Sequence, residues 1–220
     1  MNNQIRILDC TLRDGGYYNN WNFSAELTSS YFQSIKESGV SCLEVGTRNF
    51  PQDRFLGAFA YSADEYLRSL PLPEEMDIAV MVDAKTLLSR DASIADSVKA
   101  LFSKKSESPV DIVRVAIHFS EVLSTRQVAQ EISQLGYKVI VNLMQSGGKS
   151  DEALKGAAAE IASWGTVDVL YFADSLGNMD GAEVARITSA LRQEWKSDLG
   201  IHTHNNQGNA IANSITAMEL

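Results

Sequence analysis

Two short stretches at opposite ends of the sequence carry residues that can bind a metal ion. Arg13 and Asp14 follow an apolar run near the N-terminus, and His202 and His204 flank Thr203 near the C-terminus. Side chains at positions i and i+2 of a strand point the same way, so both imidazoles can reach one ion, with Asp14 as a third ligand. This donor set suits an octahedral divalent metal with open positions. The alternative interpretation is two unrelated histidines at a strand end and a salt bridge that holds a turn.

Such a set of residues suits chemistry on a 2-oxo acid. The metal would chelate the carboxylate and the carbonyl oxygen, and it would act as a Lewis acid as an enolate develops. Arg13 would add a fixed positive charge near the enolate oxygen. The third histidine, His118, ends another apolar run on the same expected face. We expect it either to transfer a proton or to make a structural hydrogen bond.

The elements that must position these residues alternate along the chain. Short runs of nearly continuous apolar character are typical of parallel strands covered on both faces. We predict strands at Ile5–Cys10, Cys42–Val45, Ile78–Val82, Ile112–His118, Val139–Met144, Val167–Ala173 and Gly200–Thr203. Segments with helical spacing separate them, at Ala25–Ser38, Ser124–Leu135, Asp151–Trp164 and Gly181–Trp195. The pattern indicates an α/β fold with a parallel sheet.

A TIM (β/α)8-type barrel is favoured over an open doubly wound sheet. The G-x-G-x-x-G turn of a dinucleotide fold is absent after the first run, where we expect Gly15 and Gly16 to form a sharp turn instead of opening a helix. Only seven strand-like runs are present, and 210–220 reads as the seventh helix. We therefore interpret 1–220 as a single barrel catalytic domain without its eighth strand. The chain is then truncated at the C-terminus, open, or closed by another chain, and an open edge favours a homo-oligomer.

Active sites of barrels lie where the strands end, which makes other polar residues at those ends candidates for substrate binding. Each has a competing structural interpretation, as a buried residue stabilising the barrel, a solvated loop residue or a helix cap. Arg114 stands within the fourth apolar run, and no role is assigned to it. The candidates for substrate binding are Glu44, Arg48, Asn142, Asp174 and Asn206.

Composition narrows the class of protein. The 220 residues carry a formal net charge of −9, which argues against nucleic acid as a partner because phosphate binding needs a basic surface. The N-terminus lacks the pattern of a signal peptide, and no run approaches the ~20 apolar residues of a membrane helix. Cys10 and Cys42 are expected to be reduced thiols. We expect a cytoplasmic protein with a small-molecule substrate and no membrane partner.

The sequence resembles a superfamily of metal-dependent lyase and synthase barrels. Their first strand ends in Arg-Asp and their seventh carries H-x-H, as in "DCTLRDGG" and "GIHTHNN" here. The superfamily includes isopropylmalate synthases, 3-hydroxy-3-methylglutaryl-CoA lyases, carboxyltransferase domains and 4-hydroxy-2-oxovalerate aldolases. The segments "DIVRVAIHFSE", "LGYKVIVNLMQSGG" and "LYFADSLGNM" resemble the aldolases most closely. The resemblance covers nearly the whole chain.

The resemblance implies a function and a role for each matching residue. Asp14, His202 and His204 match the ligands of a Mg²⁺ or Mn²⁺ ion, and Arg13 matches the arginine that stabilises the enolate. The implied reaction is a retro-aldol cleavage through a metal-bound pyruvate enolate. A decarboxylase or acyl-condensing synthase on the same scaffold is the alternative enzyme, and a non-catalytic metal- or ligand-binding barrel is the alternative outside catalysis.

Two departures from the aldolases bear on the mechanism. Tyr17 stands where the aldolases have a histidine that acts as the general base. A tyrosine titrates near ~10, so it is a poor base at neutral pH. Tyr17 or His118 is then expected to handle the proton, or Tyr17 only lines the pocket. The later part of the aldolases, which passes an aldehyde to a dehydrogenase, has no counterpart in these residues, and we do not expect channelling.

Overall fold

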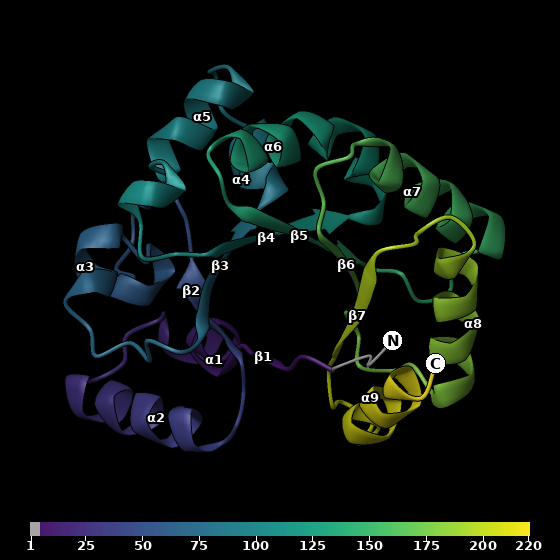
Figure 1. Ribbon diagram of the computed structural model, residues 1–220, viewed down its shortest axis with the longest axis horizontal. Helices are drawn as coiled ribbons and strands as arrows, with labels where there is room; N and C mark the ends of the chain where they lie inside the picture. Colours follow the sequence, from purple (N-terminus) through teal and green to yellow (C-terminus); the bar gives the residue numbers. More distant parts are fainter. Residues whose placement is uncertain (1–4) are drawn as a thin grey trace.

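The computed structural model describes residues 5–220 and contains one parallel sheet of seven strands, which follow each other in sequence order. Figure 1 shows that the sheet curls around a common centre and that the helices lie outside it. The strands are β1 (Leu8–Asp9), β2 (Cys42–Thr47), β3 (Asp77–Asp83), β4 (Ile112–His118), β5 (Lys138–Met144), β6 (Val169–Asp174) and β7 (Asp198–Thr203). The predicted α/β barrel-type fold is confirmed.

A helix is present in each segment for which the sequence predicts one, and further helices follow other strands. Several begin at a serine or aspartate whose side chain accepts a backbone N–H, as Ser24 does for Leu27 and Asp180 does for Glu183. Between residues 5 and 220, no helix has both the length and the apolar character needed to cross a bilayer. The α-helices are α1 (Thr11–Asn19), α2 (Ala25–Glu37), α3 (Asp64–Arg68), α4 (Ala84–Leu88), α5 (Ile94–Leu101), α6 (Val122–Gln134), α7 (Asp151–Ser163), α8 (Gly181–Arg192) and α9 (Ala210–Met218).

The two faces of the sheet pack against different partners. Outward residues such as Val80, Val113 and Val141 join the helices in a large apolar core. Inward residues, among them Ala79 and Ile112, form a smaller cluster inside the sheet. Because side chains alternate along a strand, every second residue after this inner cluster, toward the C-terminal end of each strand, also faces the interior. The alternation therefore decides which polar side chains point into the barrel.

The first and last strands leave the barrel open. Within the described residues β1 pairs only with β2 and β7 only with β6, so no eighth strand joins them. The prediction of a barrel without its eighth strand is confirmed for this part of the chain. Whether 1–220 forms a single catalytic domain stays a prediction.

The predicted first strand is too long. Only Leu8 and Asp9 pair with β2, whereas the prediction ran from Ile5 to Cys10. Ile5 and Ile7 are exposed, because β1 lies at the open edge of the sheet. The chain turns into α1 at Thr11, where the carboxylate of Asp9 accepts hydrogen bonds from the backbone N–H and the hydroxyl of that residue.

Candidate active site

Arg13 and Asp14 lie inside helix α1 and not in a turn after the first strand, which corrects the prediction. Gly15 and Gly16 also belong to this helix and do not adopt a positive φ. Gly16 is needed for space, because a Cβ there would lie 2.0 Å from the indole of Trp21. That indole donates a hydrogen bond to the carbonyl oxygen of Arg13 at 2.9 Å. Gly16 therefore leaves room for Trp21 to hold the backbone of Arg13 in place.

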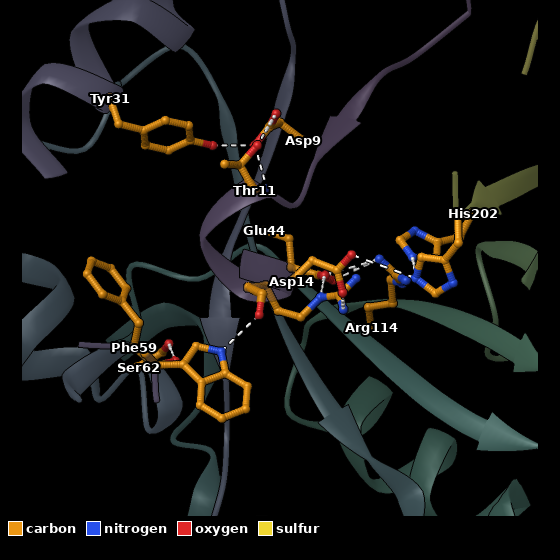
Figure 2. A network of polar contacts seen from close by, with 12 residues as sticks. Asp9, Thr11, Asp14, Tyr31, Glu44, Phe59, Ser62, Arg114 and His202 are labelled. Carbon is orange, nitrogen blue, oxygen red and sulfur yellow. Dashed lines mark hydrogen bonds and ion pairs between the residues drawn. The ribbon is translucent and has the colours of Figure 1, made fainter. Parts of the chain in front are cut away.

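Three charged side chains meet inside the barrel, above the inner apolar cluster. The carboxylate of Glu44 accepts a hydrogen bond from Nε of Arg13 at 2.6 Å and two from Nη1 of Arg114 at 3.1 and 3.2 Å. Glu44 is 0% exposed, Arg114 1% and Arg13 4%. Nη1 of Arg13 also donates to Asp14 at 2.6 Å, so one guanidinium joins the two carboxylates. Figure 2 shows this network next to His202.

Asp14, His202 and His204 come together from α1, β7 and the residue just after β7. One ligand atom from each lies within 4.8 Å of the others. The two Nε2 atoms are 3.2 Å apart, and Nε2 of His204 is 3.7 Å from the carboxylate of Asp14. Two imidazole nitrogens and one carboxylate oxygen are the donor set expected for a divalent metal.

The hydrogen bonds fix which nitrogen of His204 can bind a metal. Its Nδ1 lies 3.0 Å from the carbonyl oxygen of Asp174. A carbonyl only accepts, so Nδ1 carries the proton and Nε2 keeps its lone pair for a metal when the ring is neutral. A backbone carbonyl behind a ligand histidine is a common way to orient the ring. The residues therefore fit a divalent ion.

The charges around the cluster set its protonation. Burial and the neighbouring guanidinium groups of Arg114 and Arg13 lower the pKa of His202 to about 3, so this ring is neutral at pH 7. Burial opposes ionisation of Asp14, but the hydrogen bond to His204 and the charge of Arg13 hold the pKa of its carboxyl well below the usual value. The hydrogen bond to Asp14 raises the pKa of His204. A carboxylate and a neutral imidazole are thus ready to bind a cation.

Tyr17 lies one helical turn after Asp14 and borders a cavity of about 210 Å³. Its ring packs edge-on against Trp21, with 4.7 Å between the centroids, and the residue is 60% exposed. Partial desolvation by the surrounding protein raises the pKa of Tyr17 above its ordinary value, so its hydroxyl is protonated at neutral pH. The other side chains that line the cavity include Thr47, Asn49, Arg54, Met81 and Asp83.

Two predicted residues at strand ends take part in hydrogen bonds with the residues that follow them. His118 precedes the short turn Phe119–Glu121, and its N–H donates to the carboxylate of Glu121 at 3.2 Å. None of the polar contacts in the described part of the chain joins His118 to Asp14, His202 and His204, which together are called the metal-type cluster below. Asp174 does not point into the barrel, which corrects the prediction. It has the outward parity of Phe172, and its carboxylate accepts the N–H groups of Asn178 and Met179.

Arg48 is not a solvated loop residue, and the contacts of its side chain are structural ones. It is buried, pairs with Asp64 and donates to the carbonyl oxygen of Leu101 at 2.7 Å. This side chain ties the end of β2 to α3 and α5, away from Asp14. The sequence did not reveal this because the partners lie 16 and 53 residues away.

Asn142 and Asn206 have different surroundings. Asn142 faces the interior from β5, is almost fully buried, and its Oδ1 has no hydrogen-bond partner among the described residues. Asn206 is exposed and packs against Gly177, where a Cβ would lie 2.4 Å from its Oδ1. Asn206 was also a candidate for capping the N-terminus of α9. Its neighbour Asn205 makes the hydrogen bond there, because its side-chain oxygen accepts the N–H of Ala210.

Arg114 is the residue of the site to which sequence reasoning gave no role. The signal was a charged residue in the middle of an apolar strand, two positions after Ile112 and four before His118. An unpaired arginine is rarely buried in a core. The position of Arg114 on the inward face therefore pointed to a partner in the barrel interior.

Comparison with known proteins supports a shared ancestry over the whole described chain. A family model described as HMGL-like matches residues 4–220. The chain is 31% identical over 219 residues to 4-hydroxy-2-oxovalerate aldolase 2 of Rhodococcus opacus (strain B4), which covers 98% of this chain and 60% of that protein. It is also 31% identical to 4-hydroxy-2-oxovalerate aldolase of Geobacillus genomosp. 3, over 98% of this chain and 61% of the relative. The chain thus spans about 60% of the length of these curated relatives.

Solved structures agree with this. The N-terminal domain of a candidate aldolase from Bacteroides vulgatus superposes with a TM-score of 0.81 at 28% identity, over 98% of this chain and 69% of that one. HMG-CoA lyase of Bacillus subtilis shares the fold, with a TM-score of 0.73 at 15% identity over 97% of this chain and 72% of that one. The chain belongs to the HMGL-like family.

Proposed function

We propose that this chain carries the active site of a divalent-metal-dependent aldolase that cleaves a 4-hydroxy-2-oxo acid to pyruvate and an aldehyde. The observation that carries the proposal is the Asp14, His202 and His204 cluster held directly beside the buried guanidinium of Arg13. The aldolase relatives support the same reaction class. Mg²⁺ or Mn²⁺ is the ion we expect.

The cluster would hold the ion through one carboxylate oxygen and two imidazole nitrogens. A divalent ion bound there supplies a Lewis acid that polarises the carbonyl group of the 2-oxo acid. The neutral ring of His202 and the fixed tautomer of His204 need no rearrangement to act as ligands. This preorganisation is what a metal site requires of its protein.

Arg13 is placed to stabilise the charge that develops in the reaction. When the 4-hydroxyl group loses its proton, the bond between C3 and C4 breaks, and its electron pair moves toward the 2-oxo oxygen. An aldehyde leaves and an enolate of pyruvate remains, which takes a proton at C3. Nη2 of Arg13 is buried and has no hydrogen-bond partner in the described structure, so it is free to donate to the enolate oxygen.

Tyr17 is the residue we propose for proton transfer at the aldehyde half of the substrate. It borders the cavity and lies one helical turn after Asp14, and its raised pKa keeps the hydroxyl protonated at neutral pH. It would therefore donate a proton to the aldehyde oxygen in the direction of carbon–carbon bond formation. In cleavage, the phenolate form of Tyr17 would have to accept that proton from the substrate, and because the fraction of phenolate grows with pH, the cleavage rate is predicted to rise at alkaline pH.

The experiment is a product assay with 4-hydroxy-2-oxovalerate and Mn²⁺, in which released pyruvate is reduced by lactate dehydrogenase and the loss of NADH is followed. We expect metal-dependent pyruvate release that Arg13→Ala reduces by at least a hundredfold while leaving Mn²⁺ binding intact. Release of CO₂ from the oxo acid instead would support a decarboxylase. Metal binding without any product would refute catalysis and support a metal- or ligand-binding barrel.

A further inference from the structure

Only one of the three side-chain nitrogens of Arg114 donates a hydrogen bond within the described residues. Nη1 donates to both oxygens of Glu44, and the ring of Tyr171 lies 5.6 Å from the guanidinium carbon. Nε and Nη2 have no hydrogen-bond partner among the described residues, although the residue is 1% exposed. Buried N–H groups without an acceptor are rare in proteins because they lose their hydration without replacement.

These free donors have the geometry of an anion site. The N–H of Nε and one N–H of Nη2 lie on the same edge of a guanidinium and point in parallel, which matches the two oxygens of a carboxylate. Glu44 cannot use this edge because it occupies Nη1. The edge is therefore a bidentate donor pair that is fixed in place and has no partner within residues 5–220.

The local charge also favours an anion. Two guanidinium groups, those of Arg13 and Arg114, share the single fully buried carboxylate of Glu44. Asp14 balances Arg13 but would also be a ligand of the cation. A buried positive charge without compensation is unfavourable, so an anionic ligand would complete the network.

Arg114 lies next to the metal-type cluster. Figure 2 shows it in the same network as Asp14 and His202. Arg114 shares the carboxylate of Glu44 with Arg13, and Nη1 of Arg13 donates to Asp14 at 2.6 Å. An anion that binds to Arg114 is therefore within the same site as the ligands of the cation.

We propose that Arg114 binds the carboxylate of the 2-oxo acid through Nε and Nη2, while Arg13 serves the oxygen of the oxo group. This inference rests on the proposed function for the identity of the substrate. Arg114 is then the residue that distinguishes a 2-oxo acid from a neutral 2-oxo compound. Glu44 fixes the positions of the two arginines relative to each other by accepting hydrogen bonds from both.

The test compares pyruvate with pyruvamide, which has the same oxo group but no negative charge. Binding of each to the Mg²⁺-loaded chain is measured by isothermal titration calorimetry for the wild type and for Arg114→Lys. Lysine keeps the charge next to Glu44 but has no bidentate edge. The matched control is Arg48→Lys, which changes another buried, ion-paired arginine away from the cluster.

We expect Arg114→Lys to weaken pyruvate binding by tenfold or more and to change pyruvamide binding by less than twofold, since a hydrogen bond to a charged group is worth at least a factor of about ten. Arg48→Lys should change neither. An equal loss for both ligands would overturn the inference, because it would mean that Arg114 only supports Glu44. A wild-type chain that binds both ligands equally well would overturn it too.

The outcome can be separated from that of the proposed function. If the wild type releases pyruvate from the hydroxy-oxo acid but Arg114→Lys binds pyruvate normally, only the role of Arg114 is wrong. If the wild type releases no pyruvate but Arg114→Lys loses its preference for pyruvate over pyruvamide, the aldolase proposal fails and carboxylate binding by Arg114 is supported. Circular dichroism and urea unfolding confirm that each variant is folded.

Discussion

Glu44→Gln is the substitution that tests the buried charge network most sharply. Glu44 is 0% exposed and accepts hydrogen bonds from both Arg13 and Arg114. Glutamine has nearly the same shape, but it removes the only negative charge of this contact and turns an N–H₂ group toward the guanidinium donors. The change therefore isolates the charge and the acceptor from the packing.

The expected loss in the free energy of unfolding depends on which carboxylate partners Arg13 and Arg114 keep in the variant. Breaking a buried ion pair by removing one partner costs about 3–5 kcal/mol. Arg13 keeps Asp14 at 2.6 Å, whereas Arg114 has no other carboxylate partner in the described structure. One guanidinium is thus stranded and not two, which places the expected loss near the lower limit, at about 3 kcal/mol. With a urea m-value of about 2 kcal/mol/M, the midpoint should fall by about 1.5 M.

Urea unfolding followed by tryptophan fluorescence measures this shift. The control is Glu75→Gln, which removes an exposed carboxylate 3.6 Å from Lys36. Exposed pairs contribute about 0–1 kcal/mol, so its midpoint should move by less than about 0.5 M. If Glu44→Gln moves the midpoint no further than the control does, Glu44 does not hold two buried cations and the reasoning is refuted.

Three further predictions follow from the same geometry. Tyr17→Phe should lower the rate of aldol cleavage by about a hundredfold or more if the hydroxyl transfers a proton, and an unchanged rate in the pyruvate-release assay would show that it only lines the cavity. Gly16→Ala should destabilise the chain by about 1–3 kcal/mol because its Cβ would overlap Trp21, whereas Gly15→Ala, with no atom within 4 Å, should be neutral or stabilising by about 0.5–1 kcal/mol. Burial opposes ionisation of Asp64, yet hydrogen bonds from its partners lower the pKa of its carboxyl, so its stabilising effect is present above the unfolded pKa and is lost as the pH falls through the folded pKa. Asp64→Asn should therefore flatten the acid side of the stability–pH curve, and an unchanged slope between about pH 5 and pH 2 would contradict this.

The sequence predicted the order of strands and helices because their apolar periodicity is a local property. It also predicted which residues form the metal-type cluster. His202 and His204 stand two residues apart, so their side chains point the same way at a strand end, and Asp14 belongs to the Arg-Asp motif that resembles the lyase barrels. It did not predict that Arg13 and Asp14 lie in a helix. Two glycines suggested a turn there, and the reason for Gly16 is a contact with Trp21, five residues later.

The structure corrected the polar candidates where long-range partners decide the direction of a side chain. Arg48 turns away from the site toward Asp64, and Asp174 binds the backbone of its own loop. Strand parity would have excluded Asp174, because it shares the outward face with Phe172. No local signal could have placed Arg48. Self-association and a cytoplasmic location stay predictions.

The most direct measurement of the central claim is deuterium exchange into the methyl group of pyruvate, followed by proton NMR with and without Mg²⁺. Exchange requires an enolate, so it reports on the metal-type cluster and Arg13 without the need for the correct aldehyde. We predict exchange that depends on Mg²⁺ and that is lost in His202→Ala. Exchange at the same rate in His202→Ala, or none in a folded wild-type chain shown to bind Mg²⁺, would contradict the account.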